Sequence, residues 1–167
     1  MKIQKMLWVI VGVVTVLTTA AEAREASPHG PKGKRFGAGI VLGEPTGLTG
    51  KGYVTEHFAV DGIASWSFVD EALTLVGDVT YDFFDIPVDT DVITLPFYAG
   101  AGGKLGFDRG GRNDGDTIVG VRVPVGVAVQ WVKYPIEVYL EVAPGIELAP
   151  STEVDITGGL GARFYFF

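Results

Sequence analysis

The stretch VDITGGLGARFYFF, residues 154–167, alternates strictly between two kinds of residue up to the last residue given. Successive side chains of a β-strand point to opposite faces, so this pattern predicts a strand with one apolar and one polar face. The apolar face carries Val154, Ile156, Leu160, Ala162, Phe164 and Phe166. The other face carries Asp155, Thr157, Gly159, Gly161, Arg163 and Tyr165.

The N-terminal residues have the composition of an export signal. Two lysines precede an apolar run over residues 6–17, which is followed by small residues and the triplet Ala21-Glu22-Ala23. This order predicts a signal peptide over residues 1–23 that is cleaved on export. The apolar run is shorter than the roughly 20 residues that a membrane-spanning helix needs.

Charge and cysteine content exclude several classes of function. Without the signal peptide the chain carries 11 basic and 19 acidic residues, a formal net charge of −8. Nucleic-acid binding needs a clustered basic surface, so we expect no nucleic-acid partner. The sequence has no cysteine, which excludes disulfides, thiolate metal sites and a lipid-modified cysteine.

The rest of the chain divides into a leader and a single domain. Residues 24–34, rich in Pro, Gly and charge, predict a flexible N-terminal leader. Residues 35–167 contain eight alternating segments separated by turn-forming residues, and they predict an all-β fold, an eight-stranded antiparallel up-and-down transmembrane β-barrel. The segments are residues 35–42, 47–54, 58–68, 72–84, 95–107, 117–131, 136–149 and 154–167.

Two patterns favour a membrane barrel over a soluble periplasmic lipocalin-like barrel, which stays open as an alternative. The polar face combines glycine with charges of both signs, unlike the Lys, Glu and Thr coat of a water-facing sheet. Aromatic residues fall at the ends of the apolar face, as in the interfacial girdles of membrane barrels. We expect Phe36, Phe58, Phe83, Phe97, Trp131 and Phe166 at the periplasmic rim and Trp66 and Phe107 at the outer rim.

The alternation also places a set of charged residues inside the predicted barrel. Eight strands leave an interior only just wide enough for side chains to fill, so we expect a packed network of ion pairs. The alternative is that the acidic excess lines a narrow, cation-preferring channel for small solutes. The inward charges are Arg35, Lys51, Asp61, Asp78, Asp82, Lys104, Arg122, Glu137, Glu141, Glu147, Asp155 and Arg163.

We expect no catalysis, no cofactor and no metal site. A lipid hydrolase or acyltransferase at the outer rim needs a histidine there, but His29 falls in the leader and His57 in a periplasmic turn. The stretch DRGGRNDGD, residues 108–116, lacks the spacing of a calcium loop. We instead expect it to be a surface loop that meets lipopolysaccharide phosphates, host surfaces or phage. Its charged residues are Asp108, Arg109, Arg112, Asp114 and Asp116.

The mature chain resembles the small eight-stranded bacterial outer-membrane barrels of the OmpA-like and OmpX-like group. The resemblance rests on the signal peptide, the alternating segments, the aromatic rims and the ARFYFF ending. In that group a final strand ending in Phe is read by the outer-membrane assembly machinery, which implies this role for Phe164, Phe166 and Phe167. Phe167 falls on the inward face, so one residue follows the expected final outward Phe.

The resemblance implies a monomer in the outer membrane of a Gram-negative cell, in contact with outer-membrane lipid and lipopolysaccharide. We therefore expect an integral membrane protein with a plugged lumen and a structural or interaction role. A porin-like channel and a soluble binding barrel remain the alternatives.

Overall fold

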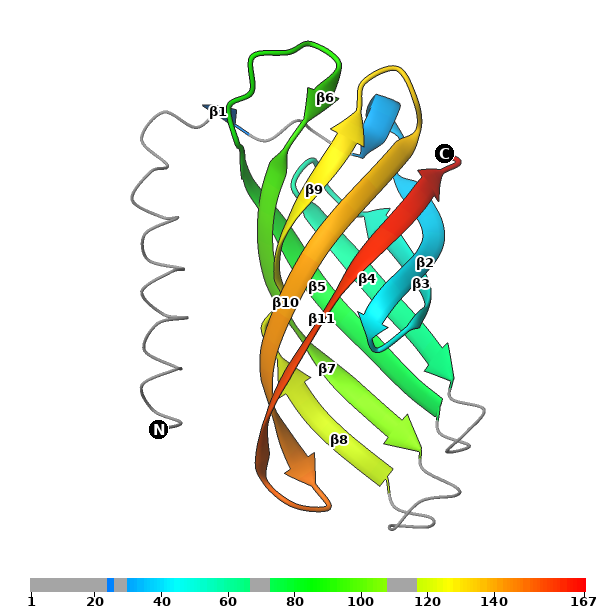
Figure 1. Cartoon of the computed structure of the whole chain (residues 1–167), viewed down its shortest axis with the longest axis vertical. Helices are drawn as coiled ribbons and strands as arrows, with labels where there is room; N and C mark the ends of the chain where they lie inside the picture. Colours follow the sequence, from blue (N-terminus) through cyan, green and yellow to red (C-terminus); the bar gives the residue numbers. More distant parts are fainter. Residues whose placement is uncertain (1–23, 26–29, 67–72, 108–116) are drawn as a thin grey trace.

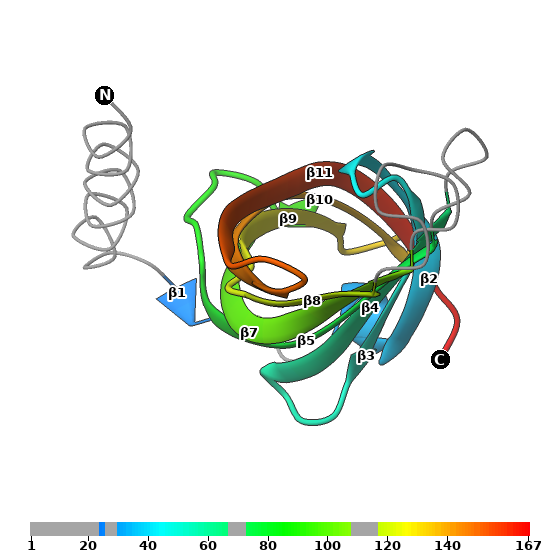
Figure 2. The ribbon, with the colours of Figure 1, turned by 90° about the horizontal axis from the view of Figure 1, so that it is seen from below.

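The computed structural model describes residues 24–25, 30–66, 73–107 and 117–167. The expected signal peptide at residues 1–23 and the expected contact loop at residues 108–116 lie outside the described residues. Nearly all of the described chain is extended, and it forms the wall of one closed barrel (Figures 1 and 2).

Eight antiparallel strands make up the wall. Each pairs with the next along the chain, and the last pairs with the first, which confirms the predicted all-β, up-and-down eight-stranded barrel. The strands are β2 (Phe36–Glu44), β3 (Gly47–Tyr53), β4 (Phe58–Trp66), β5 (Leu73–Asp85), β7 (Pro96–Phe107), β8 (Thr117–Arg122) continued by β9 (Val125–Trp131), β10 (Ile136–Ala149) and β11 (Glu153–Tyr165).

Proline interrupts the sixth barrel strand between β8 and β9. Pro124 has no N–H to give to the ladder, although its carbonyl accepts a hydrogen bond from the Gly100 amide at 2.9 Å. The pairing with β10 keeps one register across the break, with Val125 opposite Val142 and Arg122 opposite Gly145. The two elements therefore act as one strand of the barrel.

Short elements gather at the end of the barrel where the chain terminates, which we call the C-terminal end (Figure 1). They are β1 (Arg24–Glu25), which pairs with β5, the 3-10 turn η2 (Pro31–Gly33), and β6 (Ile93–Thr94), which pairs with β9. The leader that was expected to be flexible thus contains a short strand and a turn in its described part. Pro31 of η2 is buried.

The two ends of the barrel wall meet at a closing seam between β2 and β11. The Phe166 amide donates to the Phe36 carbonyl at 2.8 Å, and the amides of Arg35 and Phe36 both donate to the Phe167 carbonyl. Lys34 Nζ donates to the Phe166 carbonyl at 2.7 Å. Backbone and side-chain hydrogen bonds thus fasten the leader to the last strand.

Burial alternates along the strands with the period of the pleat, and the apolar side faces outward. On β10, Leu140 and Val142 are exposed, whereas Glu137, Tyr139 and Glu141 are buried. A soluble protein has the opposite arrangement. The barrel therefore carries its hydrophobic surface outside and its charged residues inside.

The expected aromatic rims are exposed in most positions. Phe36, Phe58, Phe83, Phe166, Trp66 and Phe107 are exposed, and Trp131 is half-buried. Phe97 departs from the expectation because it is only 7% exposed. The rings of Phe83 and Phe84 on β5 lie against it, with centroids 6.3 and 5.1 Å away. Phe97 thus packs within the wall.

A row of glycines crosses the outward face of four adjacent strands. Gly50, Gly62, Gly77 and Gly103 are successive cross-strand partners on β3, β4, β5 and β7. A Cβ atom on Gly77 would meet nothing within 4 Å, so packing does not require glycine there. On the inward face, by contrast, a Cβ on Gly102 would overlap the Asp78 carboxylate.

No helix within the described residues is long and apolar enough to cross a membrane.

Candidate functional site: the charged lumen

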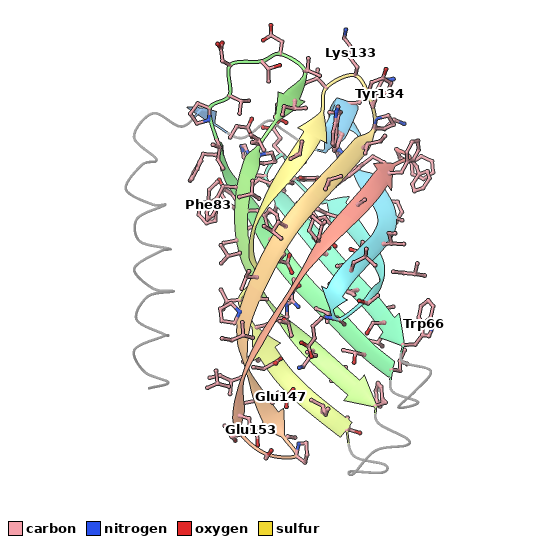
Figure 3. The ribbon with its side chains drawn as sticks, viewed as in Figure 1. Trp66, Phe83, Lys133, Tyr134, Glu147 and Glu153 are labelled. Atoms are coloured by element: carbon pink, nitrogen blue, oxygen red, sulfur yellow. The ribbon has the colours of Figure 1, made fainter. Side chains whose placement is uncertain are left out.

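The structure brings all of the expected lumenal charges together except one. Lys51, Asp61, Asp78, Asp82, Arg122, Glu137, Glu141 and Arg163 are buried inside the barrel. Lys104, Glu147 and Asp155 are 14%, 23% and 30% exposed. Glu147 lies toward the opposite end, which holds the turn between β10 and β11 (Figure 3), and Lys104 and Asp155 contact each other beside it. Exposure therefore rises along the lumen, away from the C-terminal end.

Arg35 corrects the expectation that it joins this network. It precedes β2 at the closing seam and is exposed. Arg35 has the inward position in the alternation of β2, but it precedes the first residue of that strand. The barrel wall ends there, so the side chain stays exposed. Arg35 therefore lies outside the buried network.

Arg163 on β11 is the centre of the network near the C-terminal end. Its Nη1 donates to Glu137 Oε1 on β10 at 3.0 Å, and its Nη2 lies 2.5 Å from Asp61 Oδ1 on β4. Its Nε donates to Thr49 Oγ1 on β3 at 3.1 Å. The guanidinium also lies over the Tyr139 ring, 3.9 Å from its centroid. One cation thus connects four strands across the lumen.

Lys51 has one carboxylate partner and two aromatic ones. Its Nζ lies 3.5 Å from Asp82 Oδ1 and within 5 Å of the ring centroids of Tyr53 and Tyr98, at 4.9 and 4.7 Å. The Tyr53 hydroxyl donates to Asp82 Oδ2 at 2.7 Å. Cation–π contacts strengthen when water is excluded, and Lys51 is 1% exposed. The ammonium is therefore held by charge and by ring faces.

Glu137 lies at the centre of a layer of polar side chains in the lumen. Besides Arg163, it accepts hydrogen bonds from Gln130 Nε2 at 2.8 Å and from the Tyr165 hydroxyl at 3.1 Å. Glu137 and the rings of Tyr98, Tyr139 and Tyr165 are at most 1% exposed. Buried carboxylates are tolerated when donors satisfy them in this way. We call this group of almost inaccessible side chains, Glu137 with Tyr98, Tyr139 and Tyr165, the tyrosine layer.

Arg122 organises the middle of the lumen. Its Nη2 pairs with Glu141 Oε1, and its Nε lies 3.3 Å from Asp78 Oδ1. Its Nη1 lies 3.3 Å from Thr157 Oγ1. The Tyr98 hydroxyl donates to Glu141 Oε2 at 3.0 Å, which links this cluster to the tyrosine layer.

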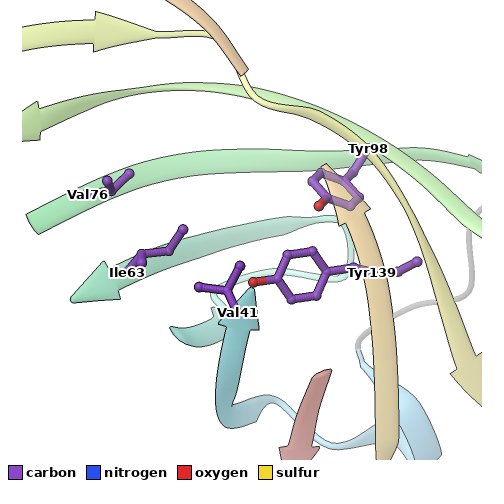
Figure 4. Packing of buried hydrophobic residues seen from close by; sticks show 6 residues of the cluster. Val41, Ile63, Val76, Tyr98 and Tyr139 are labelled. Carbon is purple, nitrogen blue, oxygen red and sulfur yellow. The ribbon is translucent and has the colours of Figure 1, made fainter. Parts of the chain in front are cut away.

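An apolar wall and a small cavity lie beside the Arg122 cluster. Val41, Ile63 and Val76 pack with Tyr98 and Tyr139 on the inward face (Figure 4). A cavity of about 10 Å³ lies between Val41, Ile63, Arg122 and Glu141. That volume holds about one water molecule. This cavity therefore has room for a water molecule but not for a larger solute.

Lys104 forms the most accessible cluster. Its Nζ lies 2.7 Å from Glu147 Oε1 and 2.5 Å from Asp155 Oδ2. Lys104, Arg122 and Arg163 thus share a pattern in which one cation is held by two carboxylates. Over the described lumen four cations face seven carboxylates, so the interior has an acidic excess.

Several polar residues of the site were not singled out from the sequence. Tyr53, Tyr98, Tyr165, Thr49 and Gln130 supply hydrogen bonds and ring faces to the charges. The same alternation that places Lys51 and Arg163 inside places Tyr53 and Tyr165 inside. The two-residue alternation could therefore have predicted that these tyrosines face the lumen, although it does not predict which charges they bind.

The structure describes the expected assembly-signal residues but not the expected contact loop. Asp108, Arg109, Arg112, Asp114 and Asp116 lie outside the described residues. Phe164 and Phe166 are each 47% exposed with their ring centroids 5.3 Å apart, and Phe167 is 81% exposed. The part of the chain that the structure describes contains no group of three or more His, Cys, Asp or Glu side chains arranged to hold a metal ion.

No protein-family model matches the chain, and searches of curated proteins and of solved structures found no match either.

Proposed function

We propose that this chain is an integral outer-membrane barrel of the small OmpA-like or OmpX-like kind, with a plugged lumen and a structural or interaction role without catalysis. The observation that carries the proposal is the inverted burial of the barrel wall. Leu140 is 61% exposed, Ile156 61% and Leu160 52%, while Glu137, Glu141 and Arg163 on the same two strands are buried. Such a surface is costly in water and is solvated in hydrocarbon.

The plugged lumen is supported by how its charges are paired. Arg163, Arg122 and Lys104 each have two carboxylate partners, and the tyrosine layer around Glu137 is almost inaccessible. A buried charge without a partner is expensive, so this pairing favours one closed arrangement. The contribution of the protein would then come from its membrane-embedded wall and its outer loops.

A narrow cation-preferring channel is the second candidate. It is favoured by the acidic excess of the lumen and by the rise in exposure from Glu137 to Asp155. Conduction along this route would require the tyrosine layer to open. A soluble lipocalin-like barrel is less well supported, because an apolar ligand needs an apolar interior and this one is charged.

The proposed setting brings partners with it. The assembly machinery would read the strand that ends in Phe164, Phe166 and Phe167, and the inserted monomer would contact outer-membrane lipid and lipopolysaccharide. Residues 108–116 are the proposed surface contact, where two arginines can pair with phosphates.

The test is insertion followed by conductance. The mature chain, residues 24–167, is refolded into neutral phosphatidylcholine vesicles and examined by flotation and by heat-dependent mobility in SDS gels. We expect a heat-modifiable barrel that floats with the vesicles and is silent in a planar bilayer. A protein that stays in the aqueous fraction would contradict the membrane proposal. Steady cation-selective conductance steps that change when Arg122 or Glu141 is substituted would contradict the plugged barrel and favour the channel.

A further inference from the structure

Apart from Arg24 and Glu25 of β1, which pair with Asp85 and Phe84 of β5, the charged residues at the C-terminal end of the barrel fall into two sectors. The basic sector comprises residues 30–36, 131–136 and 164–167, which contain Lys32, Lys34, Arg35 and Lys133 and no Asp or Glu. The acidic sector comprises residues 54–58 and 85–95, which contain Glu56, Asp85, Asp89 and Asp91 and no Lys or Arg. The mature chain has a net charge of −8, so the positive charge of the basic sector is opposite in sign to that of the protein as a whole.

The three segments of the basic sector adjoin one another. Lys34 Nζ donates to the Phe166 carbonyl at 2.7 Å, and the Arg35 amide donates to the Phe167 carbonyl. The Tyr165 amide donates to the Pro135 carbonyl at 2.7 Å, which ties the β9–β10 turn to the end of β11. The turn bears Lys133 and Tyr134, both at the same end of the barrel (Figure 3).

Exposed aromatic side chains lie beside these basic residues. Phe36, Phe164 and Phe166 are 46%, 47% and 47% exposed, and Tyr134 is 60% exposed. Aromatic rings prefer the level of lipid headgroups, and lysine and arginine extend their charged ends toward the phosphates. The combination is therefore suited to the boundary of a membrane rather than to its interior.

We propose that the basic sector binds the phosphate of an anionic glycerophospholipid of the phosphatidylglycerol type in the leaflet that faces the periplasm. Lys34 and Arg35 are the contact residues, and Lys32 and Lys133 add to the attraction. This inference rests on the proposed function, because only an inserted barrel holds this end at the headgroups. The exposed carboxylates of the acidic sector, Glu56, Asp89 and Asp91, repel such lipids, so we expect the binding on the side of the basic sector.

The test uses Trp131, the tryptophan within the basic sector, as a fluorescent reporter. In a Trp66→Phe background, Trp131 is the only tryptophan of the mature chain, and it lines the same pocket as Lys32. Quenching of its fluorescence by brominated phosphatidylglycerol and brominated phosphatidylcholine gives the relative affinity for the two lipids. We expect a clear preference for phosphatidylglycerol, against the net charge of the protein.

Two double variants separate a local site from a general charge effect. Lys34→Gln with Arg35→Gln should lower the preference by about fivefold for each charge removed. Glu56→Gln with Asp89→Asn changes the net charge by the same amount in the opposite direction and should leave the preference within twofold. If this control raises the preference as much as the first variant lowers it, the binding follows net charge and the proposal is wrong.

The remaining outcomes also decide between the two proposals. A protein that inserts into neutral vesicles but shows equal quenching by both lipids overturns the lipid site and leaves the membrane barrel standing. A protein that does not insert overturns both. Loss of the preference on adding millimolar inorganic phosphate would show that the site takes free phosphate instead of lipid, whereas an unchanged preference supports the lipid.

Discussion

Glu137 and Arg163 are cross-strand partners on β10 and β11, both at most 2% exposed, and their side chains are joined by a 3.0 Å hydrogen bond inside the barrel. Arg163 also reaches Asp61, on the other side of the closing seam. The stability of the closed barrel therefore depends on the buried guanidinium of Arg163, which balances the charge of two buried carboxylates.

Removal of that cation should destabilise the barrel strongly. Arg163→Met leaves Glu137 and Asp61 buried without their partner, and breaking a buried pair in this way costs about 3–5 kcal/mol. Urea unfolding of the vesicle-inserted protein, followed by tryptophan fluorescence, measures the change. Arg35→Met is the matched control, since Arg35 is exposed, and it should change the free energy of unfolding by less than about 0.5 kcal/mol. Equal effects of the two variants would contradict the buried network.

Lys104 should behave differently because its cluster is partly open to solvent. We expect Lys104→Met to cost about 1 kcal/mol, the upper end of the range of exposed ion pairs, because Glu147 and Asp155 stay partly hydrated. Solvent ions screen such pairs, so the cost should shrink in 1 M salt. The cost of Arg163→Met should not shrink. Unfolding of both variants at low and high salt tests the gradient of exposure along the lumen, and identical salt dependence would contradict it.

A charge on the outward face distinguishes a membrane barrel from a soluble one. Val142 lies in the middle of β10 and Leu148 near its end, and both are about half exposed, at 49% and 53%. In a bilayer, Val142→Arg should cost about 2–4 kcal/mol, and Leu148→Arg only about 0–1 kcal/mol. For a barrel in water, neither substitution should cost more than about 0.5 kcal/mol. The measurement is again urea unfolding in vesicles.

The glycine row offers a stabilising substitution. Gly77→Ala places a methyl group in open space on the outward face, and the reduced freedom of the unfolded chain should stabilise the barrel by about 0.4–1 kcal/mol. Gly102→Ala, on the neighbouring strand but facing inward, should destabilise it, because the new Cβ meets the Asp78 carboxylate. If both substitutions shift the unfolding midpoint in the same direction, the assignment of the two faces is wrong.

Much of the fold could be predicted because one physical rule, the two-residue period of a strand, acts along nearly the whole chain. The rule does not anticipate the break at Pro124, where the wall continues through a residue that cannot donate. It also fails at Arg35, which has an inward position in the alternation but precedes the first strand of the wall and is exposed. Phe97 is a third case, because neighbouring rings cover a side chain that parity places at the surface.

Parity placed most of the lumenal charges, but it could not assign partners. Arg163 reaches Asp61 across 102 positions of sequence, and Arg122 joins Asp78 to Glu141. These pairings follow from the stagger of strands around a closed barrel, which alternation along one strand does not contain. The turn η2 and the hydrogen bonds of Lys34 and Arg35 to the carbonyls of Phe166 and Phe167 could not be predicted either, since Pro, Gly and charge specify no period.

The closing seam between β2 and β11 also has a consequence in time. Its partners are separated by almost the full length of the domain, so we expect them to pair late, after neighbouring strands along the chain have paired. Until then Arg163 has Glu137 beside it but not Asp61 and Thr49, which come from the other side of the seam. Closure of the barrel therefore also completes the pairing of Arg163. A barrel that has not closed lacks both the hydrogen bonds of the seam and the ion pair between Arg163 and Asp61.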